Sequence, residues 1–329
     1  MHIPDNYLSP STCAVMAAVM VPVWAVAIKK VKKEVTKTKM PQLGIFAALS
    51  FLMMMFNVPL PGGTTGHAVG GTLIAILMGP SAACISVSVA LMVQALLFGD
   101  GGILSFGANC FNMAFVLPFV GFYVYKFVKE RFASKGGETA ATILGSYFGI
   151  VVASLCAAVE FGIQPLLFTD AAGQALYCPY GLGVSIPAMV IPHLAVAGPV
   201  EVLFTLLIVN FVKKVSPDMI EEAPAKKTKS IWGLVLALIC LSPIGLLASG
   251  TAWGEWGADE LAGMTGYTPG GMKNEMGLKI LIPDYSVSGM PEVMGYIVSA
   301  VLGVAILVIV FKLIGNVKKD DVGVPAQAK

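Results

Sequence analysis

The first two residues of this chain, Met1 and His2, can together offer three nitrogen atoms to one metal ion. The terminal amine, the amide nitrogen of His2 and the imidazole Nδ1 can close a five-membered and then a six-membered chelate ring. The amide nitrogen binds only after it loses its proton, which requires a strongly polarising, late first-row divalent ion. Planar nitrogen sites suit Ni(II) and Cu(II), whereas Zn(II) prefers a tetrahedron. The residue types therefore predict a chelate for a late transition-metal cation.

This chelate requires a free amine on Met1. Residues 1–11 contain no Lys or Arg, whereas a secretory signal peptide carries basic residues before its apolar core. The bulky His2 should also hinder removal of Met1. We therefore expect the N-terminus to be retained.

A fourth nitrogen is available from His67, in the stretch "PLPGGTTGHA" at 59–68. Glycines around it would let the backbone approach closely, and the hydroxyls of Thr64 and Thr65 could support the ligands. The alternative is that His2 is a surface residue and that His67 is a loop residue bonded to a carbonyl.

A second glycine-rich stretch, "FGDGGILSFGANCFNMA" at 98–114, predicts an irregular, re-entering backbone. Such backbone is tolerated at membrane depth where protein or a cavity shields it. Asp100, Asn109 and Asn112 could line the cavity and orient the imidazoles. They could equally satisfy loop carbonyls.

The elements that must position these residues are those of a membrane protein. Of the 329 residues, 57% are hydrophobic and 12% charged, whereas about a quarter are charged in soluble domains. A shorter apolar run at 68–80 is counted as a crossing shielded by its neighbours. The sequence thus predicts an all-α integral membrane protein with nine crossings, the other eight falling near 12–28, 41–58, 82–98, 109–128, 139–161, 184–212, 231–249 and 293–314.

The basic residues favour one topology. With residue 1 outside and nine crossings, all of the 21 Lys and Arg residues except Lys273 and Lys279 fall inside. The C-terminus is then cytoplasmic. A chain of eight spans, with 68–80 re-entrant, is the alternative, but every later segment would then change sides.

A charged, Pro-containing stretch at 213–230 has the composition of a cytoplasmic linker. It separates a seven-span body, residues 1–212, from a two-span tail, residues 231–329. The tail contains a polar outer loop at 250–292.

Ionisable residues within spans are functional hypotheses, because they are costly in lipid. Glu160, His193 and Glu201 qualify. His193 could be a further ligand, or it could hydrogen-bond Glu160 or a carbonyl freed by Pro192.

The chain lacks a G-x-x-x-x-G-K-[ST] phosphate loop, a G-x-S-x-G elbow and an H-E-x-x-H helix. These absences disfavour an enzyme and ATP hydrolysis by the chain itself, and nothing indicates nucleic-acid binding. Uphill transport would therefore need energy from another subunit or from an ion gradient. Intramembrane carboxylates are sparse, which disfavours the gradient.

Five stretches resemble the CbiM/NikM family, the substrate-capturing membrane component of energy-coupling factor transporters for cobalt and nickel. They are "MHIPDNYLSP", "PLPGGTTGHAVGG", "QALLFGDGGILSFGANCFNMAF", "EFGIQPLLF" and "HLAVAGPVE", in the family's order within residues 1 to about 212. The resemblance implies a seven-helix bundle whose N-terminus tucks into an outer pocket. It also implies that Met1, His2 and His67 hold the metal.

One departure from the family is Asn6, where the family often has glycine. We expect Asn6 to adopt the left-handed conformation in the turn after the chelate. Residues 231–315 are similar to the two-span accessory component, of the CbiN or PDGLE-type NikN kind, through "GEWGADEL" and "IPDYSV". Family precedent would place its outer loop over the metal pocket.

These features together predict a component for Ni²⁺ or Co²⁺ uptake in the plasma membrane of a prokaryote, surrounded by lipid. The resemblance implies partners of the CbiQ/CbiO or NikQ/NikO type, a transmembrane coupling subunit and ATP-binding subunits. Nickel is the first choice because a planar nitrogen field favours it. A secondary transporter or channel without ATPase partners remains the alternative, as does a metal-dependent membrane enzyme, which would need an open coordination position.

Overall fold

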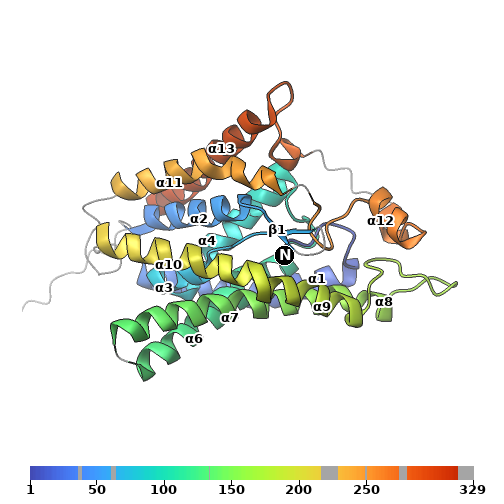
Figure 1. Ribbon diagram of the computed structural model, residues 1–329, viewed down its shortest axis with the longest axis horizontal. Coiled ribbons are helices and arrows are strands. Elements are labelled where there is room, and N and C mark those ends of the chain that lie inside the picture. The colour runs from blue at the N-terminus through green and yellow to red at the C-terminus, as the bar shows by residue number, and fades with distance from the viewer. Residues whose placement is uncertain are drawn as a thin grey trace, which may run out of the picture.

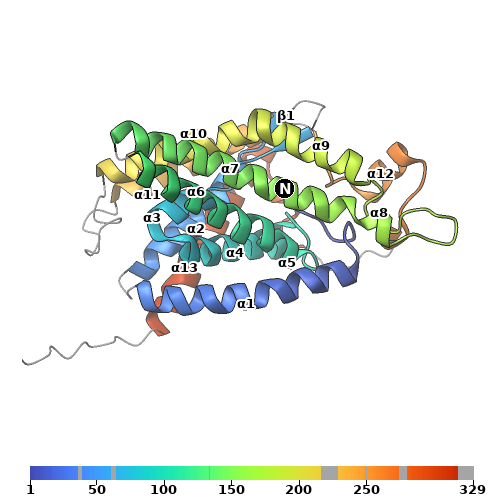
Figure 2. The ribbon, with the colours of Figure 1, turned by 90° about the horizontal axis from the view of Figure 1, so that it is seen from below.

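The computed structural model describes residues 1–35, 39–60, 64–132, 134–215, 229–248, 250–273 and 280–317. Most of the predicted linker and the predicted cytoplasmic C-terminus lie outside the described residues. Within them, the chain is a bundle of helices with one short hairpin (Figures 1 and 2).

Seven helical stretches of the described residues are long and apolar enough to cross a membrane. The chain is therefore an all-α, multi-pass membrane protein, as predicted. In chain order these stretches are α1 (Pro10–Glu34); α4 (Pro80–Val93) with η2 (Gln94–Phe98); α5 (Phe106–Asn109) with η3 (Cys110–Val116) and α6 (Leu117–Arg131); α7 (Lys135–Gly162) with α8 (Gln164–Leu167); α9 (Leu182–Pro192) with η4 (His193–Ala197) and α10 (Gly198–Val215); α11 (Lys229–Leu241) with η6 (Ser242–Leu247); and α13 (Glu292–Val317).

Two further apolar helices are shorter, α2 (Met40–Met55) and α3 (Gly71–Met78). α2 is buried on every side, because α4, α11 and α13 pack around it. α3 is joined to α4 by a turn at Gly79, whose φ of 88° is a left-handed value that favours glycine. A helix enclosed by protein need not match the thickness of the bilayer, so both can be short.

Residues 67–70, which precede α3, are not helical. Two of their backbone N–H groups, of Val69 and Gly70, donate to the buried carboxylate of Glu201 on α10, at 2.7 and 3.0 Å. Non-helical backbone at this depth needs such internal partners. Ahead of it, β1 (Val58–Leu60) and β2 (Thr64–Gly66) form an antiparallel hairpin.

The stretch at 98–114 is irregular only in its first part. Gly99 and Gly101 adopt φ values of 73° and 85°, and the chain turns without helix until Ser105. From Phe106 onwards the prediction of irregular backbone is wrong, because the chain forms α5 and the π-helical turn η3. The apolar side chains of this part pack into the bundle, which favours helix.

The basic ends of several helices meet at one end of the molecule. Lys129 near the end of α6 and Lys213 near the end of α10 both pair with Glu138 on α7, each at 2.9 Å. The basic C-terminal turn of α1 lies at the same end in Figure 2. The basic residues near the ends of α1, α6 and α10 therefore lie at one end of the bundle, which is the arrangement that the positive-inside rule predicts.

The tail packs along the body rather than standing apart. α13 lies against α2, where a Cβ at Gly303 would stand 2.3 Å from the ring of Phe51, so only glycine fits there. The segment between α11 and α13 contains α12 (Ala258–Thr265), η7 (Gly270–Lys273) and η8 (Pro283–Tyr285). It covers the end of the bundle opposite the basic helix ends (Figure 1).

Candidate metal-binding site

The N-terminal segment is buried inside the bundle. Met1, His2 and Ile3 are 5%, 2% and 0% exposed. The amide of Asn109 binds both sides of the Ile3 backbone, since Oδ1 accepts from Ile3 N at 2.7 Å and Nδ2 donates to Ile3 O at 3.0 Å. Gly102 N also donates to Ile3 O, at 2.9 Å. The backbone of the chain start is thus fixed by hydrogen bonds from Asn109 and Gly102.

A tight turn follows. Asn6 has a φ of 70°, which confirms the predicted left-handed conformation. Just before it, the Asp5 carboxylate accepts hydrogen bonds from Ile103 N at 3.0 Å and Leu104 N at 2.8 Å. A Cβ at Gly102 would stand 2.2 Å from Asp5 Oδ1, so the glycine permits this close approach.

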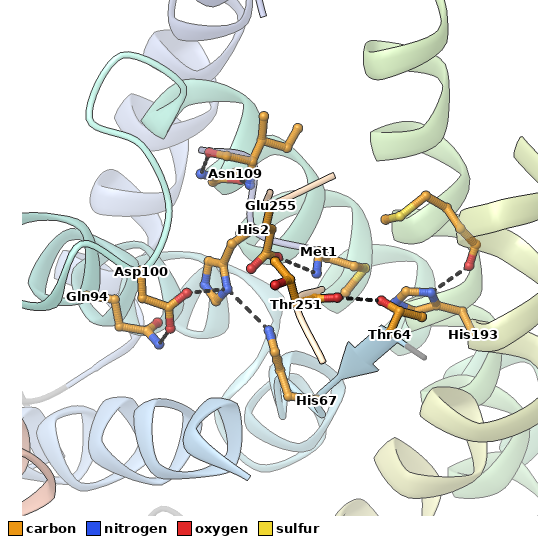
Figure 3. Close-up of polar contacts among 12 residues, drawn as sticks. Met1, His2, Thr64, His67, Gln94, Asp100, Asn109, His193, Thr251 and Glu255 are labelled. Atoms are coloured by element: carbon orange, nitrogen blue, oxygen red, sulfur yellow. Dashed lines mark hydrogen bonds and ion pairs between the residues drawn. The ribbon is translucent and has the colours of Figure 1, made fainter. Parts of the chain in front are cut away.

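The two histidines face each other (Figure 3). His2 Nδ1 lies 3.2 Å from His67 Nε2, and the ring centroids are 4.9 Å apart. Both rings are buried, with exposed fractions of 2% and 6%. Residues 65 positions apart therefore present nitrogen atoms to one point.

The tautomer of His67 follows from its neighbour. Its Nδ1 lies 3.1 Å from the carbonyl oxygen of Ala68, which can only accept, so Nδ1 carries the proton. The lone pair of Nε2 then points toward His2. Burial, and after it the terminal ammonium of Met1 and the ring of His2, lower the pKa of His67 well below its ordinary value. A neutral imidazole is the form that binds a metal.

Asp100 stands beside His2, with Oδ1 3.0 Å from Nδ1. Its other oxygen accepts from Gln94 Nε2 at 2.9 Å and from the hydroxyl of Tyr285. Burial raises the pKa of Asp100. The facing His2 and the hydrogen bonds lower it by a larger amount, so the net pKa is below its usual range. The carboxylate therefore places a negative charge next to the imidazole pair.

The terminal amine of Met1 also has an acidic neighbour. It lies 3.7 Å from Oε1 of Glu255, a residue in the segment between α11 and α13 (Figure 3). Tyr7 donates a hydrogen bond from its hydroxyl to the carbonyl oxygen of Trp256, at 2.8 Å. Glu255 and Trp256 therefore contact the first residues of the chain.

The remaining predicted site residues do not contact the imidazoles. Thr64 donates from its hydroxyl to Thr251 O at 3.1 Å, and His193 Nδ1 lies 2.7 Å from Met189 O. Asn112 donates to Glu160 at 2.8 Å. Thr64, Thr65 and His193 line a small cavity together with Met1. Neither His2 nor His67 lines this cavity.

Sequence reasoning missed Gln94, Glu255 and Tyr285 as site residues. The last two fall in "GEWGADEL" and "IPDYSV", stretches noted above only for their similarity to an accessory component. A polar or acidic residue within each was the available signal. The resemblance implied that the outer loop lies over the metal site, but nothing in the pattern indicated which of its side chains reach residues 1 and 100.

The separation of the two ring nitrogens suits a shared ion. Two nitrogens at adjacent corners of a square, each bound at about 2.0 Å, lie about 2.8 Å apart. A shift of a few tenths of an ångström would bring the observed 3.2 Å to that value. The fold and the site thus define a multi-pass membrane protein with two buried imidazoles that face each other at its N-terminus.

Comparison with known proteins gives the family. Residues 2–219 match the CbiM family, the cobalt uptake substrate-specific transmembrane region, and residues 227–320 match the PDGLE domain. The chain belongs to the CbiM family and carries a PDGLE domain behind the CbiM region.

Two of the relatives named here share this fused arrangement. The chain is 50% identical over 321 residues to the probable fused nickel transport protein LarMN of Lactiplantibacillus plantarum, covering 95% of this chain and 97% of that protein. It is 44% identical to the fused nickel transport protein NikMN of Rhodobacter capsulatus, covering 94% and 95%. The cobalt transport protein CbiM of Ruminiclostridium cellulolyticum is 32% identical and covers 68% of this chain and 88% of its own length.

A solved structure is similar as well. A truncated transition metal transporter is 54% identical, superposes with a TM-score of 0.62, and covers 65% of this chain and 99% of its own length. The relatives and the solved structure named here are thus transport proteins for nickel, cobalt or transition metals.

Proposed function

We propose that this chain captures Ni²⁺ or Co²⁺ in a four-nitrogen site and passes the ion across the membrane. The ligands are the terminal amine of Met1, the amide nitrogen and Nδ1 of His2, and Nε2 of His67. The single observation that carries the proposal is the 3.2 Å approach of two buried imidazole nitrogens, one of which belongs to the residue next to the terminal amine in the chain. Nickel and cobalt transport by the relatives supports it.

Capture exchanges protons for the ion. Without metal, the N–H at His2 Nδ1 donates a hydrogen bond to Asp100 Oδ1. The lone pair of His67 Nε2 faces the same nitrogen. A divalent ion takes the place of this proton and of protons on the amine and the His2 amide. Loading therefore releases protons, and reprotonation favours release of the ion.

Nickel is the preferred ion in this proposal. A planar nitrogen field favours Ni(II) over Co(II), although Cu(II) would bind more tightly by the Irving–Williams order. Exclusion of copper then depends on its availability rather than on affinity. Isothermal titration of the detergent-purified protein with Ni²⁺ and Co²⁺ tests the preference, and tighter binding of Co²⁺ by tenfold would overturn it.

We also propose that the chain acts as the substrate-binding component of an energy-coupling factor transporter. Its N-terminus and pocket face outward, and the basic helix ends face the cytoplasm, where a coupling subunit and ATP-binding subunits dock. The regions 1–212 and 231–329 serve as the binding component and the accessory segment. Metal uptake should therefore require ATPase partners of the NikO or CbiO type, whereas uptake that persists without them would indicate a secondary transporter or channel.

The test of the site is an extension of the N-terminus by one residue. The extension keeps every side chain but moves the amine away from His2. We expect Ni²⁺ affinity to fall by more than about a hundredfold, because losing a direct ligand costs more than the roughly 10- to 100-fold effect of an outer partner.

The matched control adds the same residue after Lys329, which should leave binding unchanged. Mass spectrometry of the purified protein should show an unmodified Met1. Full affinity in the N-terminally extended protein, or a Met1 that is removed or acylated, would refute the chelate.

A further inference from the structure

The carboxylate of Glu201 has no assigned role in binding, yet its position is unusual. It lies in the first turn of α10 and is 0% exposed. No cationic side chain pairs with it among the residues that the structure describes. Burying an unpaired carboxylate is costly unless hydrogen bonds compensate it. Its location therefore requires an explanation in terms of the groups that it binds.

Those groups are backbone N–H groups immediately after His67. Glu201 Oε2 accepts from Val69 N at 2.7 Å, and both oxygens lie 3.0 Å from Gly70 N. On the opposite side, the Ser50 hydroxyl donates to Val69 O at 2.6 Å. The backbone that follows the metal-ligand candidate is thus held from α10 and from α2.

One peptide group connects Glu201 to the ring of His67. The peptide between residues 68 and 69 presents its carbonyl oxygen to His67 Nδ1 at 3.1 Å and its N–H to Glu201 Oε2 at 2.7 Å. Since this group is planar, its carbonyl and N–H point in opposite directions from a rigid unit. The ring, the peptide and the carboxylate therefore form one continuous chain of hydrogen bonds.

This series of hydrogen bonds should make Nε2 of His67 a stronger electron-pair donor to a metal ion. A negative charge on the N–H side polarises the amide, and its carbonyl oxygen then accepts more strongly from Nδ1. Histidine ligands commonly donate their second N–H to a carboxylate or a carbonyl, which fixes the tautomer and raises the basicity of the ring. Here the carboxylate acts through an intervening peptide group.

We propose that Glu201 is a positioning residue for His67, setting the orientation and donor strength of its Nε2 through the peptide group 68–69. This inference rests on the proposed role of His67 as a metal ligand.

The experiment is a double-mutant cycle on the full chain. Ni²⁺ affinity is measured by isothermal titration for the wild type, Glu201→Gln, His67→Ala and the double variant. Glu201→Gln should weaken binding by about 10- to 100-fold, the usual cost of an outer partner of a ligating histidine. In the His67→Ala background the same change should have no further effect, because the ring through which it acts is gone.

A spectroscopic measurement reports the strength of the ligand field at the bound Ni²⁺. The visible ligand-field absorption of bound Ni²⁺ should move to longer wavelength in Glu201→Gln, since a weaker donor gives a weaker field. Glu201→Asp, which keeps the charge but is one methylene shorter, should lose less affinity and also covers the case in which the glutamine variant does not fold. Glu160→Gln is the matched control, a buried carboxylate whose partner is Asn112 and which should bind as the wild type does.

The outcomes separate the two proposals. If His67→Ala binds Ni²⁺ as tightly as the wild type, both are wrong. If His67→Ala is weak but Glu201→Gln is not, only the inference on Glu201 is overturned. An equal loss from Glu201→Gln in both backgrounds would also overturn it, because the residue would then act on stability rather than on the ring.

Discussion

At the scale of single residues, the site depends on backbone positions that let the first residues reach the bundle interior. Gly101 has a φ of 85°, and a Cβ there would lie 3.2 Å from His2 Cδ2 and 3.1 Å from Asn109 Nδ2. Gly79, at the turn between α3 and α4, has a φ of 88° but nothing within 4 Å of its Cβ position. Both glycines have a positive φ, but only at Gly101 would an added methyl group contact other residues.

This difference gives a prediction. Gly101→Ala and Gly79→Ala should each lose stability by about 1–3 kcal/mol, because both glycines have a positive φ that other residues rarely adopt. Only Gly101→Ala should also lose Ni²⁺ affinity, by roughly tenfold (1.4 kcal/mol) or more, because the methyl group displaces the ring of His2. Thermal unfolding and titration of both variants check this, and equal affinities would contradict it.

At the scale of elements, the segment between α11 and α13 contacts the site through Tyr285 and Glu255. η8 places the Tyr285 hydroxyl against Asp100, and its ring stacks on Phe98 at a centroid distance of 4.7 Å. Tyr285 therefore fixes the carboxylate that faces His2. Tyr296 on α13 is also buried, but it donates to Met55 O at 2.7 Å, at the end of α2.

Tyr285→Phe should weaken Ni²⁺ binding by about three- to tenfold, because Asp100 loses one of its two supporting donors, each worth roughly 1 kcal/mol. Tyr296→Phe removes a comparable buried hydroxyl from the neighbouring α13 and should change stability but not affinity. Isothermal titration of the two variants makes the comparison. A loss of affinity that is as large in Tyr296→Phe would show that the effect is general loosening of the tail.

At the scale of the whole molecule, the charge distribution fixes a direction across the membrane. Glu130, near the end of α6, lies with the basic helix ends, whereas Asp259 on α12 lies at the end that covers the N-terminus. Both side chains are exposed. In the proposed orientation, Asp259 is outside and Glu130 is inside.

A thiol-labelling experiment tests this orientation. In a background with the native cysteines replaced, a membrane-impermeant maleimide should label Asp259→Cys in intact cells. Glu130→Cys should react only after the cells are permeabilised, which also shows that its thiol is accessible. The reverse pattern would place the pocket on the cytoplasmic side and remove the basis for uptake.

The sequence alone determined the class of protein, most of the membrane segments and the family, because hydropathy, charge placement and local motifs are properties of neighbouring residues. It also predicted the left-handed turn at Asn6, which the structure confirms. The chelate of Met1 and His2 could be formulated without a fold, since its three nitrogens lie within two residues.

Only the tertiary structure decided which distant side chains meet. It brings Asp100 to His2, but it places Asn112 against Glu160 and His193 against Met189, away from the two rings. It also adds Glu255 and Tyr285 from the tail, and it joins Glu201 to His67 through one peptide group. Apart from the contact of His193 with Met189 four positions earlier, these contacts join residues that are tens to hundreds of positions apart, so they depend on how the helices pack rather than on any local pattern.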